Sequence, residues 1–425
     1  MIIRSARQAS SAAVPLSGIM VLLTLINTAC VSPPSPRPAP STVPPAAAAE
    51  TDAPSRSPHR VLDLSDRQFD AFSRFSRNLA DTLNQRDHAV FATALDVDEL
   101  LARITTRLSS SGTGRARIQA VSDQFRISLE HMKTNLLNQL GVSSRWKFLR
   151  LIRRDGPAGT VHSLFRLDFG DEGVQYWEFI LQQHQDSDSI RIIDWFSYAT
   201  GMTKSAELSR VSALFLSAIS GVDRDRFMGT PVYRFFHAYR ERQFIAVVLE
   251  YHNLPEELKN DRLLLAYRLE AAAAINDNEY RRALDDIARY HGEDPRFQFV
   301  LVDYHYLQGQ YTQAEKALKI FDDYIGGDAP VSVLHASLAY AQGDLPRAIR
   351  YCRRAIEQDR GYEQAYLALL DILVAARRYQ DAVLVLSILQ ERFFYRFDGS
   401  ELVQLQGYTD FVNSPAFRNW RRLAP

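Results

Sequence analysis

Apolar residues recur at helical spacing in three segments between positions 65 and 140. Ser65 and Gln68, three positions apart, form the capping-box pattern that begins a helix. SSSGTG, at 109–114, predicts a loop between the second and third segments. We therefore expect three helices here. Their apolar stripes are Phe69, Phe72, Phe75, Leu79 and Leu83; Val97, Leu100, Leu101 and Ile104; and Ile118, Val121, Phe125, Leu129, Met132, Leu136 and Leu140.

The pattern changes after Gly141 to runs that are rich in aromatic and β-branched residues, which is typical of strands. Short turn sequences with Gly, Pro, Asp and Ser separate these runs. Consecutive strands joined by short turns pair antiparallel. Helices followed by such a meander predict an α+β domain. The four predicted strands are 145–154, 160–169, 174–183 and 190–199.

Beyond residue 230 a short motif repeats: an aromatic residue or Leu, two variable residues, then a small residue. The small residue is Ala283, Ala314, Ala348 and Ala382, at steps of 31, 34 and 34 (314−283, 348−314, 382−348). A less regular copy, which begins at Phe244, precedes them. Gly309 and Gly343 stand two residues before the motif, where a turn between two helices needs a flexible residue. This period predicts helix–turn–helix repeats.

The 34-residue period and these motifs resemble the tetratricopeptide repeat, over about 230–398. The best copy is YAQGDLPRAIRYCRRAIEQD, at 340–359. The first-helix Trp of that family is missing, and its terminal Pro appears only at Pro295. The resemblance implies an all-α superhelix with a concave surface.

In that family, two positions of each first helix face the concave groove. Here those positions hold Asp303, Ser337 and Asp371, and Tyr306 and Tyr340. Tyrosine and carboxylate would suit a peptide of apolar and basic character. The alternative is that they are ordinary solvated or packing residues. The Lys and Asn pattern that clamps a C-terminal carboxylate is absent from these positions, which disfavours a receptor for chaperone tails.

The element order over about 62–205 is similar to the NTF2-like (cystatin-like cone) superfamily, in which a curved sheet wraps a helix and leaves a pocket. Some members are isomerases or dehydratases that use pocket Asp, Tyr or His residues. By this resemblance, Asp194 and Tyr198 could form an acid–base pair, because their even spacing points both to one sheet face. The alternative is a solvent-facing carboxylate and a core or rim tyrosine.

The N-terminus has the pattern of an export signal. Arg4 and Arg7 precede an apolar stretch at 18–26, which is shorter than the roughly 20 residues of a spanning helix. Thr28-Ala29-Cys30 resembles the end of a bacterial lipoprotein signal, but Asn27 departs from it. The resemblance implies a lipidated Cys30, and Val31, which is not Asp, favours the outer membrane. The alternatives are an ordinary signal cleaved near Ala29 and an uncleaved anchor.

Six parts follow from these patterns. The stretch after Cys30 is rich in Pro, Ala and Ser and cannot form a core, so it is predicted to be an extended tether. The parts are a signal peptide at 1–29, the tether at 30–60, the NTF2-like α+β domain at 61–205, a connecting helix and loop at 206–229, the repeats at 230–398 and capping helices at 399–425.

Composition narrows the function. Lys+Arg and Asp+Glu are both 50, and this zero balance argues against a protein that binds nucleic acid through a basic footprint. Besides Cys30 the chain has only Cys352, which we interpret as a buried small hydrophobe rather than a redox or metal thiol. Metal-ligand spacings, a phosphate loop and a nucleophile elbow are absent. We therefore predict no catalytic residue, no metal and no cofactor.

Two hypotheses remain. The preferred one is a lipid-anchored, non-enzymatic adaptor or scaffold that binds a protein partner in the bacterial cell envelope. It would face the periplasm from the outer membrane, or otherwise be secreted to the periplasm. The alternative is a small-molecule-binding protein, or an isomerase- or dehydratase-type enzyme, that uses the NTF2-like cone while the repeats serve assembly.

Overall fold

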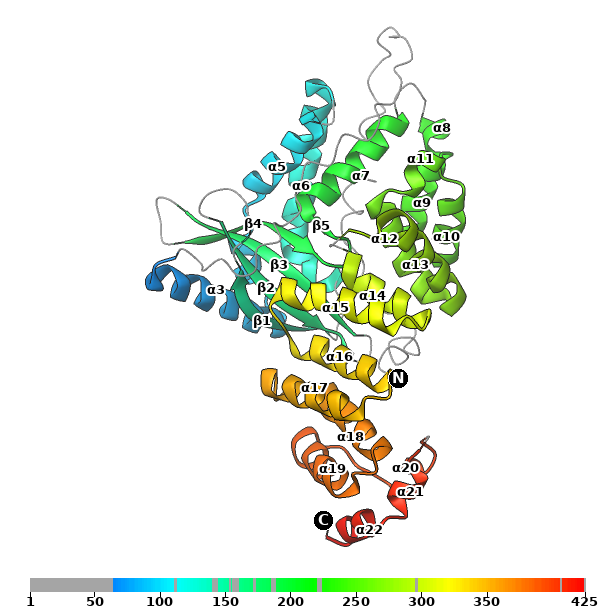
Figure 1. Ribbon diagram of the computed structural model, residues 1–425. Helices are drawn as coiled ribbons and strands as arrows, with labels where there is room; N and C mark the ends of the chain where they lie inside the picture. Colours follow the sequence, from blue (N-terminus) through cyan, green and yellow to red (C-terminus); the bar gives the residue numbers. More distant parts are fainter. Residues whose placement is uncertain are drawn as a thin grey trace. The chain divides into compact units, whose positions relative to one another are not determined.

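A computed structural model describes residues 64–110, 113–139, 144–152, 154, 160–170, 173–184, 189–219, 224–294, 297–405 and 407–423 (Figure 1). It divides after Phe297 into two compact units, here called the N-terminal and C-terminal units. The signal peptide, Cys30 and the tether lie outside the described residues, so those predictions stay untested. Likewise, no structure is described for the side chains of Val121, Leu136 and Leu140.

The helices that precede the sheet match the apolar pattern and include one more. α3 (Asp66–Asn84) begins with the predicted capping box, in which the Gln68 N–H donates to the Ser65 hydroxyl and the Gln68 side chain accepts from the Ser65 N–H. α5 (Val97–Ser110) and α6 (Arg115–Gln139) are the other predicted helices. A short helix, α4 (Ala89–Ala94), was not predicted.

The sheet is an antiparallel meander in the order β1-β2-β3-β4-β5, as the short turns predicted. The first four strands are β1 (Arg145–Ile152), β2 (Thr160–Asp168), β3 (Val174–Gln183) and β4 (Ile190–Ser197). A two-residue strand, β5 (Met202–Thr203), pairs with β4 and was not predicted. Residues directly opposite each other point to the same face, so the register assigns each paired strand residue to one of two faces.

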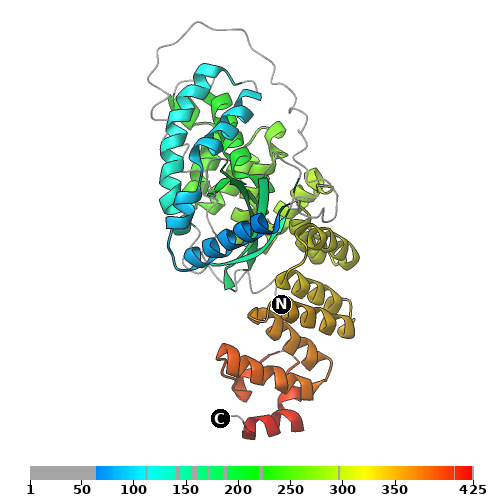
Figure 2. The same cartoon turned by 90° about the vertical axis from the view of Figure 1, so that its left-hand side faces the viewer.

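One face of the sheet is packed with aromatic rings. The ring centroids of Phe165 and Phe179 are 5.2 Å apart, and both side chains are fully buried. α3 lies against this face, where the hydroxyls of Ser163 and Ser76 are 2.7 Å apart (Figure 2). Burying each such ring stabilises the fold by roughly 1.5–3 kcal/mol. The face between sheet and helices is therefore core. Its other rings are Trp146, Phe148, Trp177 and Trp195, with Phe91 from α4.

The N-terminal unit continues with helices. α7 starts directly after β5 and packs against α5. Two pairs of neighbouring helices follow, α9 with α10 and α12 with α13. The bounds are α7 (Lys204–Ile219), α8 (Arg224–Met228), α9 (Pro231–Arg240), α10 (Phe244–His252), α11 (Glu256–Lys259), α12 (Arg262–Ile275) and α13 (Asp277–His291).

The C-terminal unit contains only helices in its described residues, as the repeat pattern predicted. α14 packs on α15, α16 on α17 and α18 on α19. Ala314, Ala348 and Ala382 are fully buried, because the paired helices approach closely there. The bounds are α14 (Gln298–Leu307), α15 (Tyr311–Ile325), α16 (Ala329–Ala341), α17 (Leu345–Gln358), α18 (Glu363–Ala375), α19 (Tyr379–Phe393), α20 (Gly399–Leu402), α21 (Thr409–Val412) and α22 (Pro415–Leu423).

Four turns between paired helices have the same hydrogen bonds. In the best copy, the Gly343 N–H donates to the Tyr340 carbonyl and the Asp344 N–H to the Ala339 carbonyl. Gly309 and Gly343 have φ of 71° and 78°, a conformation that glycine adopts without strain. Arg242 and Arg377 occupy the same turn position with φ of 55° and 56°. The turn is therefore a property of the repeat and not of glycine alone.

Cys352 lies inside the C-terminal unit and is fully buried, as predicted. Burial raises the pKa of its thiol to about 12, with a smaller contribution from Asp371. A protonated, inaccessible thiol is unreactive, so Cys352 acts as a small core residue.

Candidate functional site

The first helices α16 and α18 of the C-terminal unit each have a stripe of side chains that lies outside the core. On α16 the side chains outside the core are Leu334, Ser337, Tyr340 and Ala341. On α18 they are Glu363, Gln364, Leu367, Asp371 and Ala375. Ser337 and Asp371 hold one register position, and Ala341 and Ala375 another. We call the side chains of this stripe, with Asp303, Tyr306 and Leu307 of α14, the first-helix face.

All five residues predicted for the groove are at least partly exposed and lie on the first-helix face. Tyr340 is 47% exposed. The Tyr306 ring lies 5.6 Å from the ring of Tyr311, and the Ser337 hydroxyl donates to the Val333 carbonyl in its own helix. Asp371 accepts a hydrogen bond of 2.6 Å from the hydroxyl of Tyr408. Asp371 is thus bonded to the C-terminal helices.

Tyr408 is a buried partner of this face that sequence reasoning missed. It is only 5% exposed, and burial together with the Asp371 carboxylate raises the pKa of its hydroxyl. Burial also raises the pKa of Asp371, against the Tyr408 hydrogen bond that lowers it. The signal for Tyr408 was in the period, because it stands 68 residues after Tyr340, which is two repeats (408−340).

The C-terminal helices continue the register of the array. Ala416 follows Ala382 by the same 34 residues (416−382) and is buried. The Trp420 indole N–H donates to the Ser387 hydroxyl at 2.9 Å, which joins α22 to α19. Phe411 and Phe417 pack together in the same core, with ring centroids 5.3 Å apart. The described part of 399–423, predicted as capping helices, thus contains α20, α21 and α22, of which α22 packs on α19.

The second face of the sheet carries a buried carboxylate with three partners. Glu178 accepts from Arg154 at 2.6 Å, lies 2.9 Å from His162 Nδ1 and accepts from the Tyr198 hydroxyl. Burial alone would raise the pKa of Glu178, but the charge of Arg154 and the hydrogen bond with His162 hold it well below its ordinary value. This is a compensated buried ion pair, which stabilises the fold only while it stays complete.

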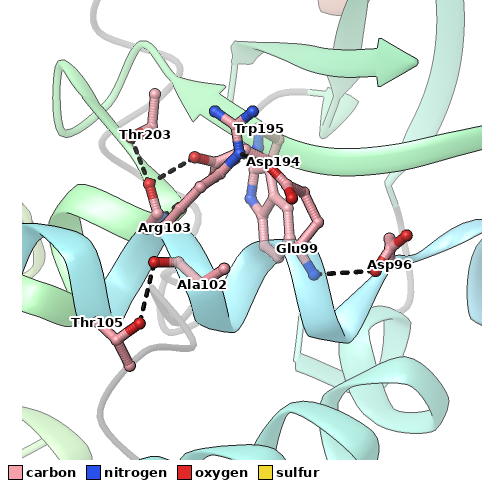
Figure 3. A network of polar contacts seen from close by, with 9 residues as sticks. Asp96, Glu99, Ala102, Arg103, Thr105, Asp194, Trp195 and Thr203 are labelled. Atoms are coloured by element: carbon pink, nitrogen blue, oxygen red, sulfur yellow. Dashed lines mark hydrogen bonds and ion pairs between the residues drawn. The ribbon is translucent and has the colours of Figure 1, made fainter. Parts of the chain in front are cut away.

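Asp194 fastens the start of α7 to the sheet. Its carboxylate accepts from the Ser205 N–H at 3.1 Å, the Ser205 hydroxyl at 2.5 Å and the Trp195 N–H at 2.9 Å. Figure 3 shows Arg103 of α5 reaching toward it. Burial raises the pKa of Asp194, and the Ser205 bonds oppose that rise. A carboxylate at a helix N-terminus satisfies backbone donors and interacts favourably with the helix dipole.

Asp194 and Tyr198 therefore have different partners in the described structure. The register puts both on the face that carries Glu178, as their even spacing predicted. Asp194 bonds to Ser205, however, whereas Tyr198 bonds to Glu178. Among the described residues, no three His, Cys, Asp or Glu side chains form a group that could hold a metal ion. Within the same residues, no helix has the length and apolar character needed to cross a membrane.

Comparison with known proteins identifies one segment. A tetratricopeptide repeat family model matches residues 339–393, which span α17, α18 and α19. No curated protein and no solved structure matches the chain. The matched segment includes two of the five predicted groove residues, Tyr340 and Asp371.

Proposed function

We propose that this chain is a non-enzymatic adaptor whose helical array binds a protein partner. The observation that carries the proposal is the first-helix face of the C-terminal unit, together with the tetratricopeptide repeat match at 339–393. Stacked repeats of this kind create an extended surface that suits protein recognition. The proposal includes the repeats before Gln298, from about residue 230, as part of the same class of array.

We further propose that the adaptor is anchored in the bacterial outer membrane and faces the periplasm. The signal-like segment at 1–29, the acceptor Cys30 and the Pro-rich tether at 30–60 support this placement. The tether would keep the folded body clear of the bilayer. In this proposal residues 61–205 form an NTF2-like body, for which the antiparallel meander and the helix α3 on its aromatic face are the support.

A scaffold role fits the sheet better than pocket chemistry does. Aromatic side chains occupy the face between sheet and helices, where a cone-shaped pocket would lie. Asp194 is bonded to Ser205 and Tyr198 to Glu178, so neither side chain is arranged for proton transfer to a substrate. We therefore place the function in the array.

Crosslinking followed by pull-down from cell envelopes tests the adaptor role. The full chain should capture a specific protein, and a variant that lacks the compact unit 298–425 should lose it. Retention of the same partner by the shortened variant would contradict the proposal.

The anchor is tested separately. Cys30→Ser should abolish labelling by a fatty-acid analogue and move the protein from the membrane to the soluble envelope fraction. Cys352→Ser is the matched control, because Cys352 is buried in the core and should not affect labelling.

A further inference from the structure

Phe394, which directly follows α19, is the most exposed large hydrophobic residue among those described, at 85%. Its backbone lies in the left-handed region, with φ of 61°. A bulky side chain rarely adopts this conformation, because its Cβ then crowds the backbone. Among the described residues, the other non-glycine residues with positive φ are all arginines. Phe394 is thus both strained and open to water.

The end of α19 needs a left-handed residue but not a phenylalanine. The Tyr395 N–H donates to the Leu389 carbonyl, a bond that closes the last turn of the helix. Two repeats earlier, 68 residues before Phe394 (394−326), the end of α15 has Gly326 with φ of 78°. Glycine adopts this conformation freely. The fold therefore gives no reason for an aromatic side chain at this position.

The aromatic residues on either side of Phe394 pack inward. Phe393, Tyr395 and Phe397 are partly buried against the core of the C-terminal unit. The Tyr395 hydroxyl donates to Glu363, and the Tyr395 ring stacks on that of Phe397 with centroids 5.7 Å apart. These contacts hold the backbone on both sides, so the Phe394 ring is presented from a fixed support.

Apolar side chains and arginines surround this ring in the sequence. Leu384 and Ile388, one helical turn apart on α19, are 63% and 39% exposed. Arg392 continues their row by four more residues, and Arg396 follows Phe394 by two. Both arginines are exposed, and neither is in an ion pair among the described residues. We call these five residues the α19 patch.

The charges of the α19 patch favour a different protein over a second copy of this chain. Two carboxylates stand nearby in the sequence, Glu391 and Asp398. Asp398 accepts from the Ser400 N–H at 2.9 Å to begin α20, which leaves the exposed Glu391 against two arginines. A two-fold pairing of the patch would bring arginines from both copies together. Carboxylates on a partner would instead complement Arg392 and Arg396.

We propose that Phe394 is a contact residue for the partner protein, which receives the ring in an apolar pocket with carboxylates at its rim for Arg392 and Arg396. This inference rests on the proposed adaptor function and adds a contact outside the first-helix face. Aromatic anchors and arginines supply much of the binding energy of protein interfaces. Backbone strain that packing does not repay is typical of such functional positions.

Site-specific photocrosslinking of the full-length chain tests the contact. Photoreactive p-benzoyl-phenylalanine in place of Phe394 should crosslink to the same protein that the unmodified chain captures from cell envelopes. Mass spectrometry of the crosslinked peptide should find an apolar site with Asp or Glu nearby. The same probe in place of Phe69, which is 43% exposed on α3, is the matched control and should not crosslink to that protein.

Phe394→Gly separates the contact from folding. It should lower capture of that protein by at least about ten-fold, as the loss of an anchor residue does. It should not lower the midpoint of urea unfolding read by Trp420, because glycine suits the left-handed turn. Phe394→Trp should keep most of the capture. Arg360→Gly, at the same register position one repeat earlier (394−360), should change capture by less than about two-fold.

The outcomes distinguish this contact from the adaptor function. Equal capture by the wild type and Phe394→Gly would overturn the contact and leave the adaptor function intact. A crosslink from position 394 to lipid or to a second copy of this chain would also overturn it, as would a crosslinked site without carboxylates. If the wild type captured no protein, or captured it equally without the unit 298–425, the adaptor function would fail and this inference with it.

Discussion

Arg377 holds the same left-handed turn conformation that Gly343 holds one repeat earlier, 34 residues before it (377−343). Both residues donate from the backbone to the carbonyl three residues before, and the following N–H donates five residues back. A left-handed conformation costs a non-glycine residue roughly 1–2 kcal/mol, whereas glycine adopts it freely. The repeat thus imposes on an arginine a conformation that its side chain disfavours.

Arg377→Gly should therefore stabilise the C-terminal unit. We expect the free energy of unfolding to rise by about 0.5–1 kcal/mol, because relief of the turn strain exceeds the extra entropy of an unfolded glycine. Urea unfolding followed by the fluorescence of Trp420 measures this change. Trp420 reports on the C-terminal unit, since the other three tryptophans lie in the sheet of the N-terminal unit. Arg353→Gly, at an exposed position inside α17, is the control and should lower stability by about 1 kcal/mol. A loss of stability in Arg377→Gly would contradict the argument.

Glu178→Gln should destabilise the N-terminal unit at neutral pH by about 3 kcal/mol, because it removes the charge that compensates buried Arg154. The folded pKa of Glu178 is depressed, so its contribution to stability is complete above the ordinary carboxyl value and is lost as pH falls toward the folded pKa. The wild-type protein should lose stability below about pH 4.5, and the variant should show a shallower loss. Urea titrations between pH 3 and 7, read by fluorescence of the sheet tryptophans, measure both effects. Glu256→Gln, whose carboxylate is 80% exposed, should change stability by less than about 0.5 kcal/mol.

Glu270 should make the same unit less stable as pH rises. Burial is the main cause that raises the pKa of Glu270 to about 8, against a hydrogen bond of 2.6 Å from Tyr239. A carboxyl with a raised pKa binds its proton more tightly in the folded state. Stability therefore falls as the pH rises from 4.5, the ordinary pKa of the carboxyl, to about 8, its folded pKa. Glu270→Gln should remove this fall and raise the free energy of unfolding by roughly 2 kcal/mol at pH 9. This is less than the full pKa shift would give, because Glu270 is only partly buried and solvent screens its charge. Urea unfolding at pH 5 and 9 tests it, with Glu241→Gln as an exposed control. An unchanged pH dependence would refute the role of Glu270.

Local pattern was enough to predict the sheet and the repeats. Aromatic runs broken by Gly, Pro, Asp and Ser are typical of a meander, and the register of β2 against β3 has no irregularity. Small residues at a fixed period mark places where helices touch, so Ala348 and Ala382 could be assigned to the core in advance. Both signals are patterns within the sequence itself, which is why these elements could be predicted without the structure.

The partners of polar side chains could not be predicted in the same way. Even spacing correctly placed Asp194 and Tyr198 on one face of the sheet. Their hydrogen-bond partners, Ser205 for Asp194 and Glu178 for Tyr198, come close only through the fold, so the spacing could not predict them. The turn at Arg377 has no glycine to mark it in the sequence, because the backbone conformation, rather than the side chain, defines that position. Tyr408 was missed because the array was ended at residue 398, although the period continues.

Ala416 tests whether the period continues to the end of the chain. Ala382→Leu should destabilise the C-terminal unit by about 1–3 kcal/mol, because it forces extra volume between packed helices. If residues 399–423 form a further pair in register, Ala416→Leu should cost a similar amount, since Ala416 is also buried. Urea unfolding read by Trp420, which lies on the same helix α22, compares the two. Ala375→Leu, at an exposed position at the end of α18, should cost less than about 0.5 kcal/mol. If Ala416→Leu behaved like Ala375→Leu, the last helices would be loosely attached, and Tyr408 would not be held against Asp371.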